Sequence, residues 1–374
     1  MSPFVFLLYR DMLNICIVVG ARPNFMKVAP IIWAVNRAKA NGREIDYKLV
    51  YAGRQDDTTL EPSLFDNLMI PHPDVYLGID CVSLNELTGR VMQEFEKYLD
   101  NNPTDVVIVV DDLASTMAAA IVTKKRGLKL AHLVAGTRSF DIKMPKEINR
   151  LVIDALSDFL FTAGMSSNSN VSREGAEISH VYMVGNILID TLRFNHARLV
   201  RPKIFDDWNL APGRYIVFTL NRRALLEDRA KIIRLIKTAD NAAGNIQVIA
   251  PLRSKAREVV ESIAGELKNI RIIEPMSYLE FGYAIANAMG VITDSGNVAE
   301  EATFNTVPCI TLNSYTEHIE TVKTGSNVLV GEDADKLASA MTDMVSGTWK
   351  KCALPDRWDG RSAERIVQIL MDSI

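Results

Sequence analysis

Cysteine and histidine are scarce in this sequence of 374 residues, which contains four cysteines and five histidines. Cys16, Cys81, Cys309 and Cys352 are widely separated and show no metal-ligand or redox spacing. We therefore expect no bound metal and a reduced, cytoplasmic setting. The pattern G-x-G-x-x-G does not follow the first predicted strand, so no nicotinamide cofactor is expected.

The sequence also lacks an excess of positive charge and any long apolar run. Its formal net charge is −4, which favours neither nucleic acid nor an anionic membrane as a partner. No apolar stretch approaches the roughly 20 residues that span a bilayer. The apolar patch at residues 4–9 has no basic segment before it and no cleavage site after it, so we interpret residues 1–11 as a disordered lead or a misassigned start.

What the chain does have is a regular alternation of strand-like and helical segments. Strand candidates lie at residues 15–19, 48–51, 106–110, 130–133, 159–161 and 181–184, and again at 215–219, 247–250, 270–273, 290–293 and 309–312. This alternation is typical of α/β folds with doubly wound parallel sheets. We predict two Rossmann-like domains, residues 12–192 and 193–352, that face each other across a cleft.

The segment ICIVVGARPNFMKVAP, residues 15–30, predicts a buried strand, a tight turn at Gly20 and a helix. Such a turn places backbone N–H groups and the positive end of a helix dipole at the carboxyl edge of a sheet, which suits an anionic ligand. Arg22 and Lys27 add positive charge there. The alternative is an ordinary strand-to-helix connection with two surface cations.

The stretch GARPNFMKVAP resembles the opening G-[TS]-R-P-E-x-x-K-x-x-P of the non-hydrolysing UDP-N-acetylglucosamine 2-epimerase family, and similar blocks continue almost to the C-terminus. The resemblance implies a GT-B-like fold, with a C-terminal helix within residues 353–374 that crosses back to the first domain. It also implies a UDP-sugar substrate, no metal or redox cofactor, a homodimer and a role in cell-envelope polysaccharide biosynthesis. The implied reaction interconverts UDP-N-acetylglucosamine and UDP-N-acetylmannosamine by elimination and re-addition of UDP.

Two adjacent acids end the strand in VVIVVDDLAST. Asp112 matches the aspartate of the family's G-D-T, which is assigned acid/base work, whereas Asp111 stands where the family has glycine. Two carboxylates that converge raise each other's pKa, which would suit proton carriers. The alternative for either acid is that it caps the helix that follows.

The block LAHLVAGTRSFD resembles the family's G-H-V-E-A-G-L-R, with His132 and Arg138 retained. The resemblance makes Arg138 a candidate for substrate binding. Val134 replaces the catalytic-type glutamate, and valine cannot carry a proton. Because His132 sits inside an apolar strand, we interpret it as a core histidine with its hydrogen bonds satisfied.

The block MPKEINR resembles P-E-E-x-N-R, in which Glu147 and Arg150 are retained and Lys146 replaces the first acid. Glu147 is therefore a candidate for a catalytic role, and Arg150 for contact with a pyrophosphate. Three residues separate the two, so an ordinary surface ion pair on a helix is the alternative.

In VFTLNRRALLED the family pattern is T-G-H-R-R-E. Asn221 replaces the histidine that approaches the sugar nucleotide, while Arg222 persists. Both remain candidates for substrate binding, although asparagine does not titrate near neutral pH.

The block ITDSGNVAEEA predicts an apolar strand followed directly by a helix. Ser295 and Gly296 allow the backbone to approach a diphosphate, and Asn297 replaces the second glycine of the family's S-G-G. Glu300 and Glu301 lie one turn into the helix, and a carboxylate, for which we favour Glu301, suits ribose hydroxyls. The alternative is a structural connection without a ligand.

The departures from the family fall on titrating residues, while the glycines and phosphate cations stay. In NSYTEHIET, for example, His318 replaces an arginine, which makes it a candidate for substrate binding and a new titrating group. This pattern favours an epimerase with altered proton carriers, Asp112 first, Asp111 second and Glu147 in part. The alternatives are a hydrolysing epimerase or glycosyltransferase, and a nucleotide-sugar-binding protein without turnover.

Overall fold

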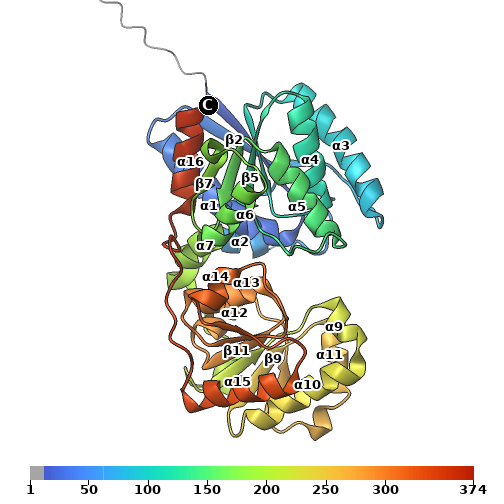
Figure 1. The fold of residues 1–374 in the computed structure, drawn as a ribbon, viewed down its shortest axis with the longest axis vertical. Helices are drawn as coiled ribbons and strands as arrows, with labels where there is room; N and C mark the ends of the chain where they lie inside the picture. The colour runs from blue at the N-terminus through green and yellow to red at the C-terminus, as the bar shows by residue number, and fades with distance from the viewer. Residues whose placement is uncertain (1–11, 62) are drawn as a thin grey trace, which may run out of the picture. The chain divides into compact units, whose positions relative to one another are not determined.

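A computed structural model describes residues 12–61 and 63–374, so the expected lead at residues 1–11 lies outside the described residues. The chain divides into two compact units (Figure 1). The first unit ends at Thr191 and regains Asp359–Ile374, and the second is Leu192–Trp358. Residues 353–358, expected with the C-terminal segment, thus group with the second unit.

The first unit is built on a parallel sheet with strand order β3-β2-β1-β4-β5-β6-β7. Its strands are β1 (Leu13–Val19), β2 (Ile45–Tyr51), β3 (Val75–Tyr76), β4 (Val106–Val110), β5 (Lys129–Ala135), β6 (Phe159–Thr162) and β7 (Val181–Met183). All five residues of β4 are buried, as expected of a strand covered on both faces. The order reverses between β1 and β4, and such a switch point is where ligands bind in doubly wound sheets.

Helices cover both faces of this sheet. They are α1 (Arg22–Ala40), α2 (Ser63–Leu68), α3 (Leu84–Asn101), α4 (Ala114–Lys125), α5 (Pro145–Leu156), α6 (Met165–Arg173) and α16 (Ser362–Ser373). The chain leaves the first unit within α7 (Ile187–Asn195). Helix α16 packs on α1 (Figure 1), and the Asp190 carboxylate accepts hydrogen bonds from its first two backbone N–H groups.

The second unit has a parallel sheet of order β10-β9-β8-β11-β12-β13, with its own reversal between β8 and β11. The strands are β8 (Tyr215–Phe218), β9 (Gln247–Pro251), β10 (Ile270–Ile273), β11 (Gly290–Thr293), β12 (Cys309–Thr311) and β13 (Asn327–Leu329). The helices are α8 (Ile204–Asp207), α9 (Arg223–Glu227), α10 (Arg229–Ala242), α11 (Ser254–Glu261), α12 (Tyr278–Ala286), α13 (Gly296–Phe304), α14 (Ile319–Lys323) and α15 (Ala334–Ser346).

Alternate residues of β8 belong to two separate apolar clusters, one on each face of the sheet. Ile216 and Phe218 join the cluster beneath α10 and α15, which lie together in Figure 1, whereas Tyr215 and Val217 join the cluster beneath α12 and α13. The period of two shows that the strand is buried on both faces. Two doubly wound parallel sheets confirm the predicted fold class. Among the described residues, no helix is both long and apolar enough to cross a membrane.

Candidate functional site

The turn from β1 into α1 is tightly packed and internally hydrogen-bonded. A Cβ atom on Gly20 would lie 2.0 Å from Ser115 Oγ, so any larger residue there would force the Ser115 side chain to move. The Asn24 side-chain oxygen accepts hydrogen bonds from the backbone N–H groups of Gly20 and Ala21, at 2.9 and 3.2 Å. The sequence pattern predicted that N–H groups of this turn would bind an anion. The N–H groups of Gly20 and Ala21 instead already donate to Asn24.

Asp111 forms an ion pair with Lys27 at this edge of the sheet. Its backbone φ is +59°, in the left-handed region that suits the glycine of the family pattern and that aspartate tolerates better than most residues. Lys27 Nζ lies 2.6 Å from one carboxylate oxygen, and Asn24 donates to the other at 2.9 Å. Lys27 is only 6% exposed, so this is a largely buried ion pair.

Asp112 turns to different partners. Arg150 donates to it from Nε at 3.0 Å and from Nη2 at 2.5 Å, and Lys146 Nζ lies 3.2 Å from the other oxygen. Burial acts to raise the pKa of Asp112, but Lys146 and Arg150 outweigh it and hold that pKa below its usual value. The two acids would raise each other's pKa if they converged, but the pKa of Asp112 is lowered and its partners differ from those of Asp111. The helix-capping alternative is wrong, because α4 begins at Ala114 with Leu113 as its N-cap.

Glu147 organises the loop that follows β5. Its carboxylate accepts hydrogen bonds from the backbone of Ser139 and Phe140, from the Ser139 hydroxyl and from Arg150, each at 2.9 Å. Burial acts to raise the pKa of Glu147, but these donors lower it overall. Glu147 and Arg150 are each 3% exposed, so the surface ion pair proposed as the alternative is wrong.

A buried network lies behind these acids. His132 contacts Asp154 through Nδ1, at 2.5 Å, and the Asp111 carbonyl through Nε2, at 2.9 Å. This confirms the interpretation of His132 as a satisfied core histidine. Arg138 is buried and pairs with Asp154 and Glu174, so the structure turns it toward the protein interior.

Sequence reasoning missed Asp154, which joins His132, Arg138 and the Gly136 backbone N–H. Burial acts to raise its pKa, but His132 and Arg138 lower it overall. A signal was present, because Glu147, Arg150 and Asp154 are spaced three and four residues apart. This spacing places three charged residues on one face of α5, and that face is buried.

Val134, at the position of the family's glutamate, has a strained backbone. Its φ is +72°, which is rare for a β-branched residue, and the pairing of β5 with β6 shifts register between Leu133 and Ala135. Strain of this kind typically costs about 1–3 kcal/mol and persists only where surrounding structure enforces it. The surrounding structure thus holds an unusual backbone shape at Val134.

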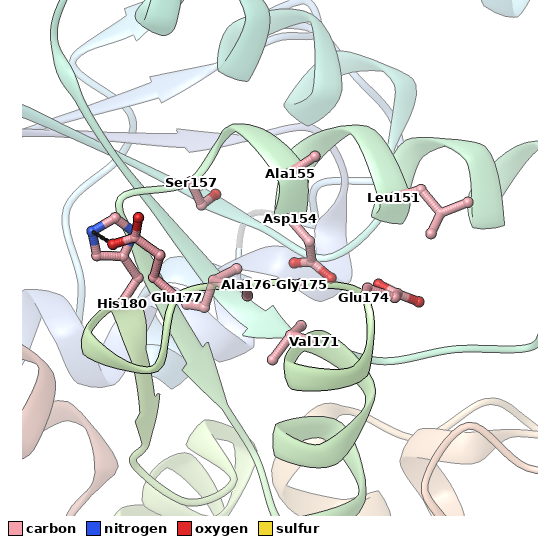
Figure 2. Close-up of a pocket in the computed structure, with 11 residues that line it drawn as sticks. Leu151, Asp154, Ala155, Ser157, Val171, Glu174, Gly175, Ala176, Glu177 and His180 are labelled. Atoms are coloured by element: carbon pink, nitrogen blue, oxygen red, sulfur yellow. Dashed lines mark ion pairs between the residues drawn. The ribbon is translucent and has the colours of Figure 1, made fainter.

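Figure 2 shows a cavity of about 520 Å³ between α5 and the end of α6. Asp154 projects from α5 toward Gly175, and the ion pair of Glu177 with His180 lies at the other end of the cavity. None of the binding or catalytic candidates from the sequence lines it. The cavity touches the buried network through Asp154 but is not the predicted site.

In the second unit, Asp294 links the loop after β11 to the loop after β8, at the point where the strand order reverses. It follows β11, and its carboxylate accepts the backbone N–H groups of Asn221 and Arg222, at 2.8 and 2.7 Å. Burial raises the pKa of Asp294 in spite of these hydrogen bonds. The Asn221 side chain is exposed, and Arg222 pairs with Glu332 at 2.6 Å.

Helix α13 begins directly after Asp294 with an uncapped first turn. Ser295 is the N-cap residue, but its side chain makes no capping hydrogen bond. Within the described residues, the backbone N–H groups of Gly296, Asn297 and Val298 also have no hydrogen-bond acceptor. Such N–H groups, at the positive end of a helix dipole, favour an anion.

Two acids of α13 differ in their surroundings. Glu300 lies 2.9 Å from His318 Nδ1. The Glu301 side chain is 93% buried, and no ion pair or hydrogen bond of its carboxyl group is found among the described residues. Burial, with the neighbouring Glu300 charge, raises the pKa of Glu301 to about 8. The raised pKa favours the protonated form of Glu301 near neutral pH.

The remaining candidate, Arg22, opens α1 and pairs with Glu61 at 3.0 Å, with both side chains partly exposed. The structure thus gathers the sequence candidates at two sheet edges, one in each unit. Lys27, Asp111, Asp112 and Arg150 lie at the first edge. Asn221, Arg222, Gly296 and Glu301 belong to the second.

Comparison with known proteins gives a consistent result along the chain. The family model for UDP-N-acetylglucosamine 2-epimerase matches residues 37–371. The chain is 34% identical to the UDP-N-acetylglucosamine 2-epimerase of Methanocaldococcus jannaschii, with 96% of this chain and 99% of that protein covered, and equally identical to a homolog from Methanococcus maripaludis over the same shares. A crystal structure of the M. jannaschii enzyme in complex with UDP-GlcNAc and UDP is 31% identical, covers 96% of this chain and 100% of its own, and superposes with a TM-score of 0.82. The chain therefore belongs to the UDP-N-acetylglucosamine 2-epimerase family.

Proposed function

We propose that this protein interconverts UDP-N-acetylglucosamine and UDP-N-acetylmannosamine. The observation that carries the proposal is the family match over residues 37–371, together with a relative whose structure holds UDP-GlcNAc and UDP. The uncapped first turn of α13 supports it, because the diphosphate of a UDP-sugar is the kind of anion that such a turn stabilises.

For binding, we assign the diphosphate to the first turn of α13, Ser295–Asn297, and we keep Arg22, in the first unit, as a separate candidate for substrate binding. The ribose hydroxyls are assigned to Glu301. Its carboxyl group has no partner among the described residues, and a bound hydroxyl would satisfy it. Asn221 and Arg222 flank this turn through their hydrogen bonds to Asp294.

For chemistry, we propose that a carboxylate removes the proton at carbon 2 of the sugar as UDP leaves, and that a second group returns a proton to the opposite face as UDP adds back. Asp112 suits the role of base because Lys146 and Arg150 keep it ionised. Asp111, hydrogen-bonded to Lys27, is the candidate for the second carrier. Glu147 supports both by holding Arg150 and the loop at residues 139–140.

A specific observation favours a second candidate function, nucleotide-sugar binding without turnover. Asp111 and Asp112, proposed for proton transfer, and Glu147, which supports them, are all bound to cations or backbone donors, and the pKa values of Asp112 and Glu147 lie below their usual range. A carboxylate held in this way is a weak base. In this alternative the protein binds the diphosphate of a nucleotide sugar, but its carboxylates do not transfer protons.

We further infer a cytoplasmic homodimer that serves cell-envelope polysaccharide synthesis. The family resemblance supports the dimer and the role. The absence of disulfides among Cys16, Cys81, Cys309 and Cys352 is compatible with a reduced compartment.

One experiment separates the candidates: a proton NMR time course with UDP-N-acetylglucosamine in deuterated water. An epimerase exchanges the carbon 2 proton for deuterium and produces the second epimer. Steady release of UDP with a free sugar would identify a hydrolysing enzyme instead. Line broadening of the nucleotide signals without exchange or new products would identify a binding protein, and spectra identical to those of a protein-free sample would contradict both candidates.

A further inference from the structure

His318 lies against the first residue of α13. A Cβ atom built on Gly296 would lie 2.9 Å from His318 Cδ2 and 3.2 Å from Nε2, so the absence of a side chain at Gly296 lets the imidazole approach the helix start. The same helix start carries the N–H groups of Gly296, Asn297 and Val298 that have no acceptor among the described residues. The ring thus borders the anion site proposed above.

The two ring nitrogens have different surroundings. Nδ1 lies 2.9 Å from a Glu300 carboxylate oxygen, and the Glu300 side chain is only 3% exposed. A hydrogen bond to a carboxylate requires a proton on Nδ1, and it leaves the ring edge formed by Cδ2 and Nε2 facing Gly296. A buried carboxylate beside the ring also favours the doubly protonated imidazolium, in which Nε2 is a charged donor.

We propose that His318, as an imidazolium, is the pH-dependent cation of the diphosphate site, and that Glu300 is the positioning residue that orients its ring and favours its charge. This inference rests on the proposed function, since it requires that α13 bind a UDP-sugar. It adds a property that an arginine at this position would lack, because arginine stays charged at every physiological pH.

The other acids near His318 favour its protonated form when they are ionised. Glu301 follows Glu300 on α13, and Glu317 and Glu320 lie in the segment of His318 itself. These are acids, which favour a cation when ionised. Lys323 is exposed at the other end of α14. A UDP-sugar keeps both diphosphate charges across neutral pH, so affinity should be highest at low pH and fall as His318 loses its proton.

The test is calorimetry with UDP-N-acetylglucosamine from about pH 5.5 to about pH 8.5, the range in which histidine changes charge. The protein, His318→Gln and His318→Arg are compared. We expect the affinity of the unaltered protein to exceed that of His318→Gln by about tenfold at low pH and to converge with it at high pH. His318→Arg should keep the high affinity throughout. Glu301 titrates in all three proteins, so its contribution cancels in the comparison.

The variant Glu300→Gln tests whether Glu300 acts through its negative charge or only through the hydrogen bond that orients the His318 ring. Glutamine can still accept the hydrogen bond from Nδ1 but removes the negative charge, so the pH at which affinity falls should move lower. A structural role for Glu300 would lower affinity equally at every pH. Imidazole NMR signals of the unaltered protein give a measurement that needs no variant, since bound UDP-N-acetylglucosamine should raise the pH at which His318 titrates.

Parallel pH profiles for the unaltered protein and His318→Gln would overturn the inference, as would an imidazole titration that the ligand does not move. Absence of UDP-N-acetylglucosamine binding at any pH, in all variants, would instead contradict the proposed function.

Discussion

The two sheet edges that carry the candidate residues differ in how their charges are matched. At the first edge the acids are paired within the unit, Asp111 with Lys27 and Asp112 with Arg150 and Lys146. At the second edge, the first turn of α13 is uncapped and the Glu301 carboxyl has no partner among the described residues. The first edge is therefore organised in advance, whereas the second has hydrogen-bonding capacity that a ligand can fill.

Asp112→Asn, at the first edge, should have the largest effect of these variants, and the effect should be on catalysis. If the protein epimerises, exchange of the carbon 2 proton should fall by ~100-fold or more, because general acid–base assistance is typically worth that much. The measurement is the NMR exchange experiment in deuterated water. UDP affinity should change little, since the residues assigned to UDP lie elsewhere. Asp111→Asn should do likewise if the two acids share the task, and unchanged exchange in both variants would place the chemistry on other residues.

Glu301→Ala should break the second edge. A lost hydrogen bond to a charged or buried group costs ~1.5–3 kcal/mol, so UDP affinity measured by calorimetry should fall by about tenfold or more. Arg22→Ala should have a similar effect. Asp335→Asn, a change in the first turn of α15, serves as the control. Full affinity in both Glu301→Ala and Arg22→Ala would remove the binding assignment.

Glu301 also gives the second edge a pH-dependent stability. Its pKa rises from 4.5 in the unfolded chain to about 8 in the fold, so the folded state holds a proton that the unfolded chain has lost. Relative to Glu301→Gln, the unaltered protein should lose roughly 1 kcal/mol of stability per pH unit between pH 4.5 and about 8. Urea unfolding at several pH values measures this. Parallel stability curves would show that the carboxyl group is not desolvated.

Val134→Gly should have the smallest effect, at the first edge. Glycine adopts a φ of +72° without strain, but it also makes the unfolded chain more flexible and removes a partly buried side chain. The balance should stabilise the protein by about 1 kcal/mol, measured as a higher urea midpoint with an unchanged slope. A lower midpoint would mean that the packing of the Val134 side chain outweighs the strain.

Sequence reasoning located both edges because its signals there are local. The apolar runs that became β1 and β11 end directly at Gly20 and Asp294, and apolar periodicity marks the helices that follow. The edge strands β3 and β13, of two and three residues, were not predicted.

The charge pairing at the first edge could not be predicted. Lys27 and Asp111 are 84 residues apart, and their contact depends on β1 and β4 being neighbours in the sheet. For the same reason the sequence could not show whether the carboxylates of Asp111 and Asp112 converge. The two acids lie in the turn after β4, where Asp111 has a left-handed backbone, and each pairs with a different cation, Asp111 with Lys27 and Asp112 with Arg150.

The hydrogen bonds from Ser362 and Ala363 to Asp190 tie two distant parts of the first unit together. They bring the point where the chain leaves the first unit next to the point where it returns. In topological terms the second unit is an insertion, a continuous stretch placed between two neighbouring positions of its host. The inserted unit can be expressed as a single uninterrupted polypeptide, whereas the host needs a short linker from Thr191 to Asp359 to keep α16 in place.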